Sequence, residues 1–227
     1  MSAFSIYITG TDTGIGKTLA STALLHALRG HGLRGVGMKP VASGCELVDG
    51  QWRNADALAL LAASDPRPAY LDLNPYALPA PLAPELAARD AGVEVSLQVL
   101  LDAHARLAAQ TDALVVEGVG GWAAPLSALL MQADLVRALR LPVVLVVGLR
   151  LGCLNHALLS ARAVAAEGME LAGWIASHVD PAMERVDDNL QMLRERLPAS
   201  CWGVLPHALE PDPASMASHL RIPMLVE

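Results

Sequence analysis

The stretch "ITGTDTGIGKTLAS", residues 8–21, joins the end of a short apolar run to a segment with helical spacing. Small residues fill the junction, and Lys17 and Thr18 follow its last glycine. This order of strand, glycine-rich turn, Lys-Thr and helix is typical of a phosphate-binding loop. Gly10 and Gly16 are one residue further apart than in the common GxxxxGK[ST] pattern, so the loop keeps the working parts without the strict spacing.

Such a loop binds anions through its backbone. The N–H groups of residues 14–18 would point at phosphate oxygens, assisted by the start of the following helix. The Lys17 side chain would reach the β and γ phosphates, and the Thr18 hydroxyl would ligate Mg²⁺. A glycine-rich turn that only joins a strand to a helix is the alternative, but the strand and helix context favours phosphate binding.

Lysine is scarce in this chain. Of the 16 basic residues, only Lys17 and Lys39 are lysines and the rest are arginines. A codon bias towards arginine explains the ratio, yet it would leave lysine where arginine cannot substitute. A compact ammonium on a flexible stem is often needed in phosphate chemistry, and a planar guanidinium does not replace it. Both lysines are therefore candidate catalytic residues.

Apolar runs rich in β-branched residues alternate with Ala/Leu-rich segments of helical spacing. This alternation predicts an α/β fold, with a mostly parallel sheet and helices on both faces. The Pro-rich stretch 66–84 is interpreted as an ordered loop over the sheet, so that 1–227 forms a single domain. The predicted strands are 4–10, 35–41, 113–119, 142–149, 171–179 and 201–206, and the predicted helices are 17–29, 55–63, 96–109, 127–139, 154–167 and 184–196.

Composition excludes several classes of protein. The net charge is −7 and no run of basic residues occurs, which argues against a nucleic-acid groove.

The three cysteines form no CxxC pair, which suits a reducing cytoplasm. Cys153 and His156 lie three residues apart with no further ligands nearby, which favours a structural role over a metal site. No signal peptide is expected, and the longest apolar stretch is too short to span a bilayer.

Three carboxylates could complete the metal site. Glu117 ends the run "ALVVE", at the carboxyl edge of a strand, where open α/β sheets bind ligands. Asp56 begins a predicted helix, where a carboxylate can also serve simply as a favourable charge at the helix start. Asp12 lies in the loop itself. Considered singly, Glu117 is the first metal candidate and Asp56 the second.

The chain resembles a known family over nearly its whole length. The segments "TGTDTGIGKT", "GMKPVASG", "RNADALAL", "NPY", "VVEGVGGWAAPLS", "LPVVLVVGLRLGCLNHALL" and "LAGWIAS" occur in the order found in the dethiobiotin synthetase family. The resemblance implies a P-loop NTPase-like fold and a homodimer with the substrate site near the interface. It also implies a ligase that uses ATP and Mg²⁺ to convert 7,8-diaminopelargonic acid and CO₂ to dethiobiotin.

The resemblance assigns roles position by position. Lys39 and Lys17 would be catalytic. Mg²⁺ would be held by Thr18, Asp56 and Glu117. The nucleotide would contact Thr13, Gly14, Ile15, Gly16, Lys17, Thr18, Asp56, Glu117, Gly118, Val119, Gly120, Ser177, His178, Pro206, His207, Ala208 and Glu210. The substrate would contact Lys39, Ser43 and Gly121, and its carboxylate would meet Leu151, Gly152, Cys153 and Asn155 across the dimer.

The sequence departs from the family at two places. Gly14 stands where some members have Glu, so no side chain contacts nucleotide or metal from that position. Ser177-His178 stands where many members have Asn-Asp. An Asn amide can read adenine through two hydrogen bonds, and a single hydroxyl cannot. This difference predicts weak discrimination among nucleoside triphosphates.

Two other functions share these sequence features. A switch ATPase of the Min/Par kind would bind a protein partner through the same fold. Its phosphate loop carries an additional lysine at the position of Asp12, which argues against that assignment. An amide-forming synthetase related to cobyrinate synthesis opens similarly but usually adds a glutaminase domain, for which 227 residues leave no room.

Overall fold

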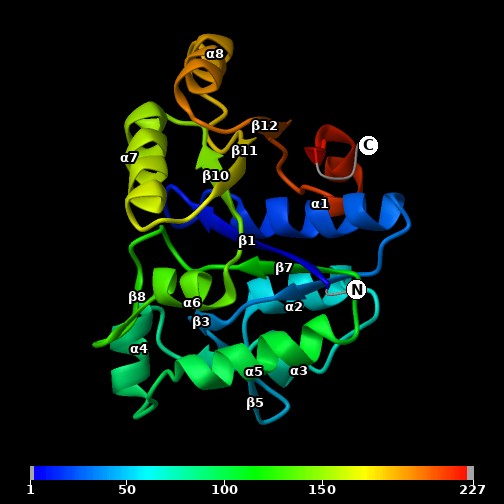
Figure 1. Cartoon of the computed structure of the whole chain (residues 1–227), viewed down its shortest axis with the longest axis vertical. Coiled ribbons are helices and arrows are strands. Elements are labelled where there is room, and N and C mark those ends of the chain that lie inside the picture. Colours follow the sequence, from blue (N-terminus) through cyan, green and yellow to red (C-terminus); the bar gives the residue numbers. More distant parts are fainter. Residues whose placement is uncertain (1–2, 224–227) are drawn as a thin grey trace.

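Six parallel strands form the central sheet of the computed structural model, which describes residues 3–223 (Figure 1). Their order is β12-β11-β10-β1-β7-β2, so β1, which leads into the glycine-rich loop, is central. The predicted parallel sheet is confirmed. The strands are β1 (Phe4–Gly10), β2 (Gly35–Met38), β7 (Ala113–Glu117), β10 (Val143–Gly148), β11 (Leu171–Ser177) and β12 (Cys201–Leu205).

Helices cover both faces of the sheet, as the alternating pattern predicts. Successive side chains of a strand point to opposite faces. Ile6 and Ile8 of β1 pack in a cluster with residues of the helical segments 17–30, 55–63 and 213–216, whereas Tyr7 packs in a cluster with residues of the helices 97–108 and 132–139 on the other face. The longer helices are α1 (Lys17–Gly30), α2 (Ala55–Ala63), α4 (Pro84–Asp90), α5 (Leu97–Ala108), α6 (Gln132–Leu139), α7 (Cys153–Ala166) and α8 (Val186–Arg196). Short helices are α3 (Tyr70–Leu73), α9 (Pro213–Met216) and the 3₁₀ turn Ala217–His219.

The predicted strand 35–41 is divided into two. β2 ends at Met38, and β3 (Val41–Ser43) pairs instead with β6 (Tyr76–Leu78) in a separate two-stranded parallel sheet. Pro40 separates the two strands and cannot donate to a ladder. The stretch 66–84, predicted as an ordered loop, in fact contains α3 and β6.

The helix predicted over 127–139 begins late. β8 (Pro125–Ser127) and β9 (Leu130–Met131) form a small antiparallel pair, and α6 starts only at Gln132. Leu130 of β9 packs in a buried cluster with Leu126 and Leu135, although the sequence shows only a continuous apolar run at 128–131. The hairpin of β4 (Glu46–Val48) and β5 (Gln51–Arg53) was not predicted, because its strands are short and exposed.

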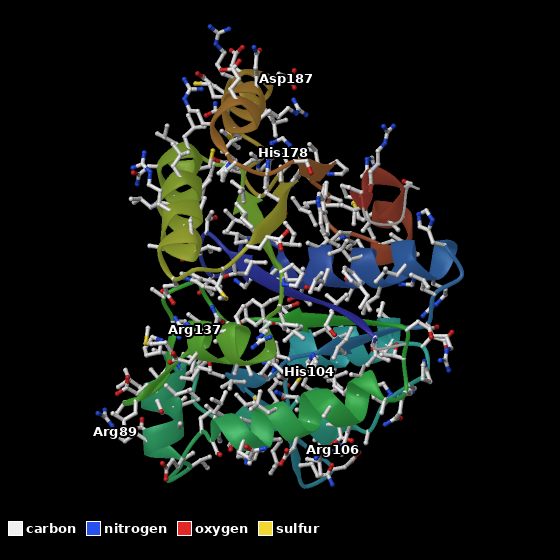
Figure 2. All side chains as sticks on the ribbon, viewed as in Figure 1. Arg89, His104, Arg106, Arg137, His178 and Asp187 are labelled. Carbon is white, nitrogen blue, oxygen red and sulfur yellow. The ribbon has the colours of Figure 1, made fainter. Side chains whose placement is uncertain are left out.

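The carboxyl ends of the six strands meet at one edge of the sheet. The glycine-rich loop follows β1, Lys39 follows β2, and Gly118 follows β7 at this edge. His178, which follows β11 and is labelled in Figure 2, donates its backbone N–H to the carbonyl of Leu205, the last residue of β12. None of the helices within residues 3–223 is long and apolar enough to cross a membrane.

Candidate functional site

The glycine-rich loop has the backbone that its sequence requires. Gly14 has φ 70° and Gly16 has φ 85°, a left-handed conformation that side chains strongly disfavour. A Cβ on Gly10 would meet Ile15 Cδ1 at 2.9 Å and Lys17 Cδ at 3.0 Å. Ile15 is buried and anchors the loop, whereas Thr13 and Gly14 are exposed. The loop therefore leaves an open surface directly before the first turn of α1.

Lys17 is held inside this loop. Its side chain is buried, and Nζ donates to the backbone oxygen of Asp12 at 2.7 Å. Burial, and then the charge of Lys39, lower the pKa of Lys17 to about 8. The Asp12 carboxylate forms an ion pair with Arg150, which ties the loop to the segment after β10. No protein carboxylate pairs with Lys17 within residues 3–223, so its charge is available to an anion.

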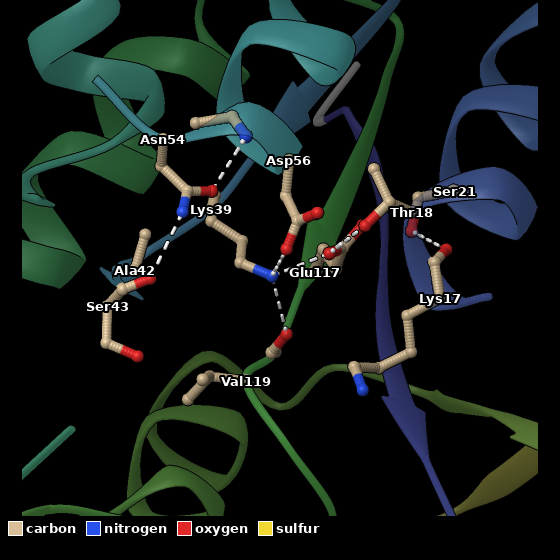
Figure 3. Close-up of polar contacts among 12 residues, drawn as sticks. Lys17, Thr18, Ser21, Lys39, Ala42, Ser43, Asn54, Asp56, Glu117 and Val119 are labelled. Carbon is tan, nitrogen blue, oxygen red and sulfur yellow. Dashed lines mark hydrogen bonds and ion pairs between the residues drawn. The ribbon is translucent and has the colours of Figure 1, made fainter. Parts of the chain in front are cut away.

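Lys39 lies between two carboxylates from different elements (Figure 3). Its Nζ is 2.6 Å from Glu117 Oε1, at the end of β7, and 2.9 Å from Asp56 Oδ2, in the first turn of α2. It also donates to the carbonyl of Gly118 at 3.2 Å. The Thr18 hydroxyl donates to the same Glu117 oxygen at 2.9 Å. Segments far apart in sequence thus bring five predicted site residues together.

These charges stabilise one another. Burial works against the charge on Lys39, but the carboxylates of Glu117 and Asp56 outweigh it and raise the pKa of Lys39. Burial likewise opposes the charge on Asp56, and the Lys39 ammonium nevertheless keeps the pKa of Asp56 below its usual value. Lys39 and Asp56 are therefore both charged at neutral pH. A buried pair of this kind is retained for chemistry or specificity more readily than for stability.

Thr18, Asp56 and Glu117 form a donor set that fits Mg²⁺. Glu117 is fully buried, and its Oε2 has no hydrogen-bond partner within residues 3–223. Two carboxylates and a hydroxyl are hard oxygen ligands, and Mg²⁺ typically takes one or two carboxylates together with waters and substrate phosphates. The described residues contain no cluster of three or more His, Cys, Asp or Glu side chains that could hold a metal by themselves.

A pocket of about 340 Å³ opens above these groups. Asn54 and Ser43 lie on its wall; Asn54 caps α2 through Ala57 N–H at 3.2 Å and donates to Ser43 O at 3.3 Å. The remaining lining residues come from the glycine-rich loop, from the segment after β7 and from around Lys39. The whole set is Thr13, Gly14, Gly16, Lys17, Thr18, Lys39, Ala42, Ser43, Asn54, Asp56, Val119 and Gly120.

A second pocket, of about 680 Å³, shares part of this wall and is mostly apolar. Its lining includes Pro81, Leu82, Pro84 and Pro125, none of which the sequence analysis singled out. The Pro-rich composition of "ALPAPLAPE" was the available signal. A polar, cationic pocket thus continues into a groove suited to an aliphatic chain.

The residues predicted to meet the base lie together at the neighbouring strand ends. Ser177 is buried, and its Oγ would overlap a Cβ on Gly16, so the hydroxyl lies against the glycine-rich loop. His207 Nδ1 is 3.2 Å from the carbonyl of His178. Pro206 and Ala208 flank His207 directly after β12, and Glu210 is exposed further along.

Two further sets of predicted residues do not line the polar pocket: the glycines after β7 at positions 118 and 121, and the residues predicted to meet the substrate carboxylate. Gly121 lines a separate hollow with Trp122, and Gly118 has no space for a side chain beside Tyr7 and Gln132. Of the residues predicted to meet the substrate carboxylate, Leu151, Gly152 and Asn155 are exposed at the start of α7, whereas Cys153 is buried in the core.

The chain is similar to known proteins over nearly its whole length. A family described as an AAA domain matches residues 5–215. The chain is 65% identical over 219 residues to the ATP-dependent dethiobiotin synthetase BioD of Xanthomonas oryzae pv. oryzae, covering 96% of this chain and 98% of that protein. A protein of the same name from Xylella fastidiosa is 62% identical over 223 residues, with 97% and 98% covered.

Among solved structures, the MinD cell division protein of Aquifex aeolicus has a similar fold. The TM-score is 0.55 at 16% identity, covering 95% of this chain and 86% of that chain. The MinC:MinD complex of the same organism gives a TM-score of 0.54 at 14% identity, with 95% and 85% covered. At these identities the likeness concerns the fold alone.

Proposed function

The chain belongs to the dethiobiotin synthetase family, and we propose that the polar pocket is where it closes the ureido ring of dethiobiotin. The substrates are 7,8-diaminopelargonic acid, CO₂ and ATP, and the products are dethiobiotin, ADP and phosphate. The observation that carries the proposal is the convergence of Lys17, Lys39, Asp56, Glu117 and Thr18 on a pocket that continues into an apolar groove. One end of that arrangement suits a triphosphate, and the other suits an aliphatic acid.

The proposed reaction has three steps. One amine of the substrate takes up CO₂ as a carbamate and releases a proton. A carbamate oxygen then attacks the γ-phosphorus of ATP, forming a carbamic–phosphoric anhydride and releasing ADP. The second amine attacks the carbamate carbon and releases a proton, so that the C–N bond closes the ureido ring, the C–O bond breaks and phosphate leaves with its electron pair.

The side chains contribute position and positive charge. Phosphoryl transfer spreads negative charge over oxygens, so catalysis depends on holding the reactants in line and placing cations beside them. Lys17 and the backbone N–H groups of the loop would bind the β and γ phosphates, and Lys39 would face the carbamate and the transferred phosphoryl group. Mg²⁺, held by Thr18, Asp56 and Glu117, would supply a Lewis acid for the phosphate oxygens.

We further propose a cytoplasmic homodimer of one-domain subunits. The exposed residues Leu151, Gly152 and Asn155 do not line the polar pocket of their own chain within the described residues, which supports their serving the partner's site. The Asp12–Arg150 ion pair would link the phosphate loop of one site to the carboxylate-binding segment of the other. A Min/Par-type switch gains no support, since Asp12 occupies the position of that class's additional lysine.

The direct test is to measure ADP and dethiobiotin with and without the diamine and bicarbonate. We expect both products to depend on both additions, in a ratio of one to one. A rate of phosphate release that does not change when the diamine is added would overturn the proposal and favour a nucleotide switch.

A further inference from the structure

The short helix α3 and the residue after it hold both backbone groups of Lys39. The Lys39 N–H donates to the Leu73 carbonyl at 2.7 Å, and the Lys39 carbonyl accepts from Asn74 Nδ2 at 2.7 Å. Asn74 is 1% exposed, and its amide also donates to the Tyr76 carbonyl at 3.2 Å. Leu73 and Asn74, the first residue of "NPY", therefore fix the backbone from which the Lys39 side chain extends.

The same helix holds the start of α2. The Tyr70 hydroxyl accepts the Asn54 N–H at 2.8 Å and donates to Asn74 Oδ1 at 3.2 Å. Asn54 is the capping residue of α2, and Asp56 lies two positions further along. The Arg53 guanidinium also packs on the Tyr70 ring, with its Cζ 3.9 Å from the ring centroid. One hydroxyl thus joins the element that carries Asp56 to the residue that holds Lys39.

We propose that Tyr70 and Asn74 are positioning residues that set the distance between Lys39 and Asp56. Lys39 follows the end of β2, and Asp56 belongs to α2. The distance of 2.9 Å between Lys39 Nζ and Asp56 Oδ2 therefore depends on how these two elements are held relative to each other. Neither Tyr70 nor Asn74 is among the described residues that line the polar pocket, so both act through Lys39 and Asp56. Misplacement of a reacting group by about 1 Å can cost on the order of a hundredfold in rate.

The chain provides a matched control for this proposal. The Tyr76 hydroxyl accepts the Ser96 N–H at 2.9 Å, and Ser96 is the residue before α5. Tyr70→Phe and Tyr76→Phe therefore each remove one partly buried hydroxyl that accepts a backbone N–H at a helix start. Only the first hydroxyl also contacts the residue that holds Lys39. A general loss of packing or stability would appear equally in both variants.

The first measurement is the steady-state kinetics of dethiobiotin formation, with thermal unfolding midpoints recorded alongside. We expect kcat to fall about tenfold or more in Tyr70→Phe, with KM for ATP and for the diamine unchanged within about twofold. Tyr76→Phe should keep the wild-type kcat at a similar unfolding midpoint. Equal values of kcat in the two variants would overturn the proposal.

A double-mutant comparison tests the route of the effect. If Tyr70 acts through Asp56, adding Tyr70→Phe to Asp56→Asn should cost less than about threefold further in kcat, because residues in one network are not additive. Full multiplication of the two losses would contradict a shared route. Crystal structures of Tyr70→Phe and Tyr76→Phe supply a measure that does not depend on the reaction. A longer Nζ–Oδ2 distance in Tyr70→Phe alone would support the positioning role of Tyr70 even if the proposed function fails. Only the catalytic meaning of that role rests on the proposed function. An unchanged distance would refute the positioning role.

Discussion

Lys39 Nζ lies 2.6 Å from Glu117 Oε1, the same carboxylate oxygen that accepts the Thr18 hydroxyl at 2.9 Å. The lysine ammonium therefore stands among the three side chains proposed to hold Mg²⁺. Two cations cannot share this position, because like charges a few ångströms apart in a buried site repel strongly. We therefore expect entry of the metal to displace Nζ from the carboxylates towards the pocket, where the phosphoryl groups would lie.

We predict that Lys39→Met binds divalent cations more tightly than the wild type in the absence of nucleotide. Removing the competing ammonium leaves Asp56 and Glu117 free to ligate, and the gain should be on the order of tenfold to a hundredfold, the usual range of coupling between two ligands. Titration calorimetry with Mg²⁺, or electron paramagnetic resonance with Mn²⁺, measures the affinity. Arg106→Met, which removes an exposed cation paired with Asp72, is the control. Identical affinities in the wild type and both variants would refute competition between the Lys39 ammonium and the metal ion.

We predict that ATP affinity falls as pH rises through the pKa of Lys17. Burial, and then Lys39, lower this pKa to about 8, so the side chain loses its charge above that pH in the unliganded protein. The phosphate groups require the charged form, and the loss should approach tenfold per pH unit above about 8. Calorimetric titrations from about pH 7 to about 9.5 test this window. Lys17→Arg stays charged throughout, so its affinity, whatever its value, should remain flat.

Stability should move in the opposite direction over the same window. The unfolded lysine keeps its proton up to about 10.4. Between about 8 and 10.4 the unfolded chain thus binds more protons, and the contribution of Lys17 to the free energy of unfolding rises with pH. Denaturant unfolding of the wild type and of Lys17→Met isolates this contribution as the difference between their pH profiles. A difference that stays constant with pH would show that the pKa of Lys17 is not lowered.

Mixing two inactive variants tests the proposed dimer. If Asn155 serves the neighbouring subunit's substrate, Asn155→Ala and Lys39→Ala should recover activity when their subunits exchange. One hybrid dimer then holds one intact site, so statistical exchange of equal amounts restores about a quarter of the wild-type activity. Activity should be followed after refolding or prolonged mixing, with exchange verified by native mass spectrometry. Verified exchange without recovery would place both residues in the site of one chain.

Nucleotide selectivity is expected to be weak. The Ser177 hydroxyl lies against Gly16 and offers no amide to pair with adenine, whereas a bidentate pair is worth about 1–3 kcal/mol of discrimination. We predict that ATP is preferred over CTP, GTP and ITP by less than roughly a hundredfold, or about 2.7 kcal/mol. The measurement is kcat/KM for each triphosphate at saturating diamine and bicarbonate. A larger preference would show that backbone groups near Pro206 select the base unaided.

The sequence predicts those parts of the molecule that depend on local pattern. The parallel sheet and the turn before Lys17 follow from apolar runs and glycine spacing, and the two lysines of the chain both line one pocket. The Lys39–Asp56–Glu117 contact depends on distances among three separate segments, which no local pattern encodes. The predicted helix 127–139 starts too early because the apolar run 128–131 is continuous with the helical segment in the sequence, whereas Leu130 and Met131 belong to the β8–β9 pair. The sequence does not predict the apolar groove, because the proline-rich segment that forms its wall has the composition of an ordinary loop.

The confinement of both lysines to the pocket has a spectroscopic consequence. Protein grown with ¹⁵N-labelled lysine in an otherwise unlabelled background contains only two labelled side chains, at positions 17 and 39. Every side-chain signal in its nuclear magnetic resonance spectrum then reports on the candidate site, and the rest of the chain is silent. Titration with each ligand in turn would display the order in which the two ammonium groups change their surroundings, with no probe attached to the protein.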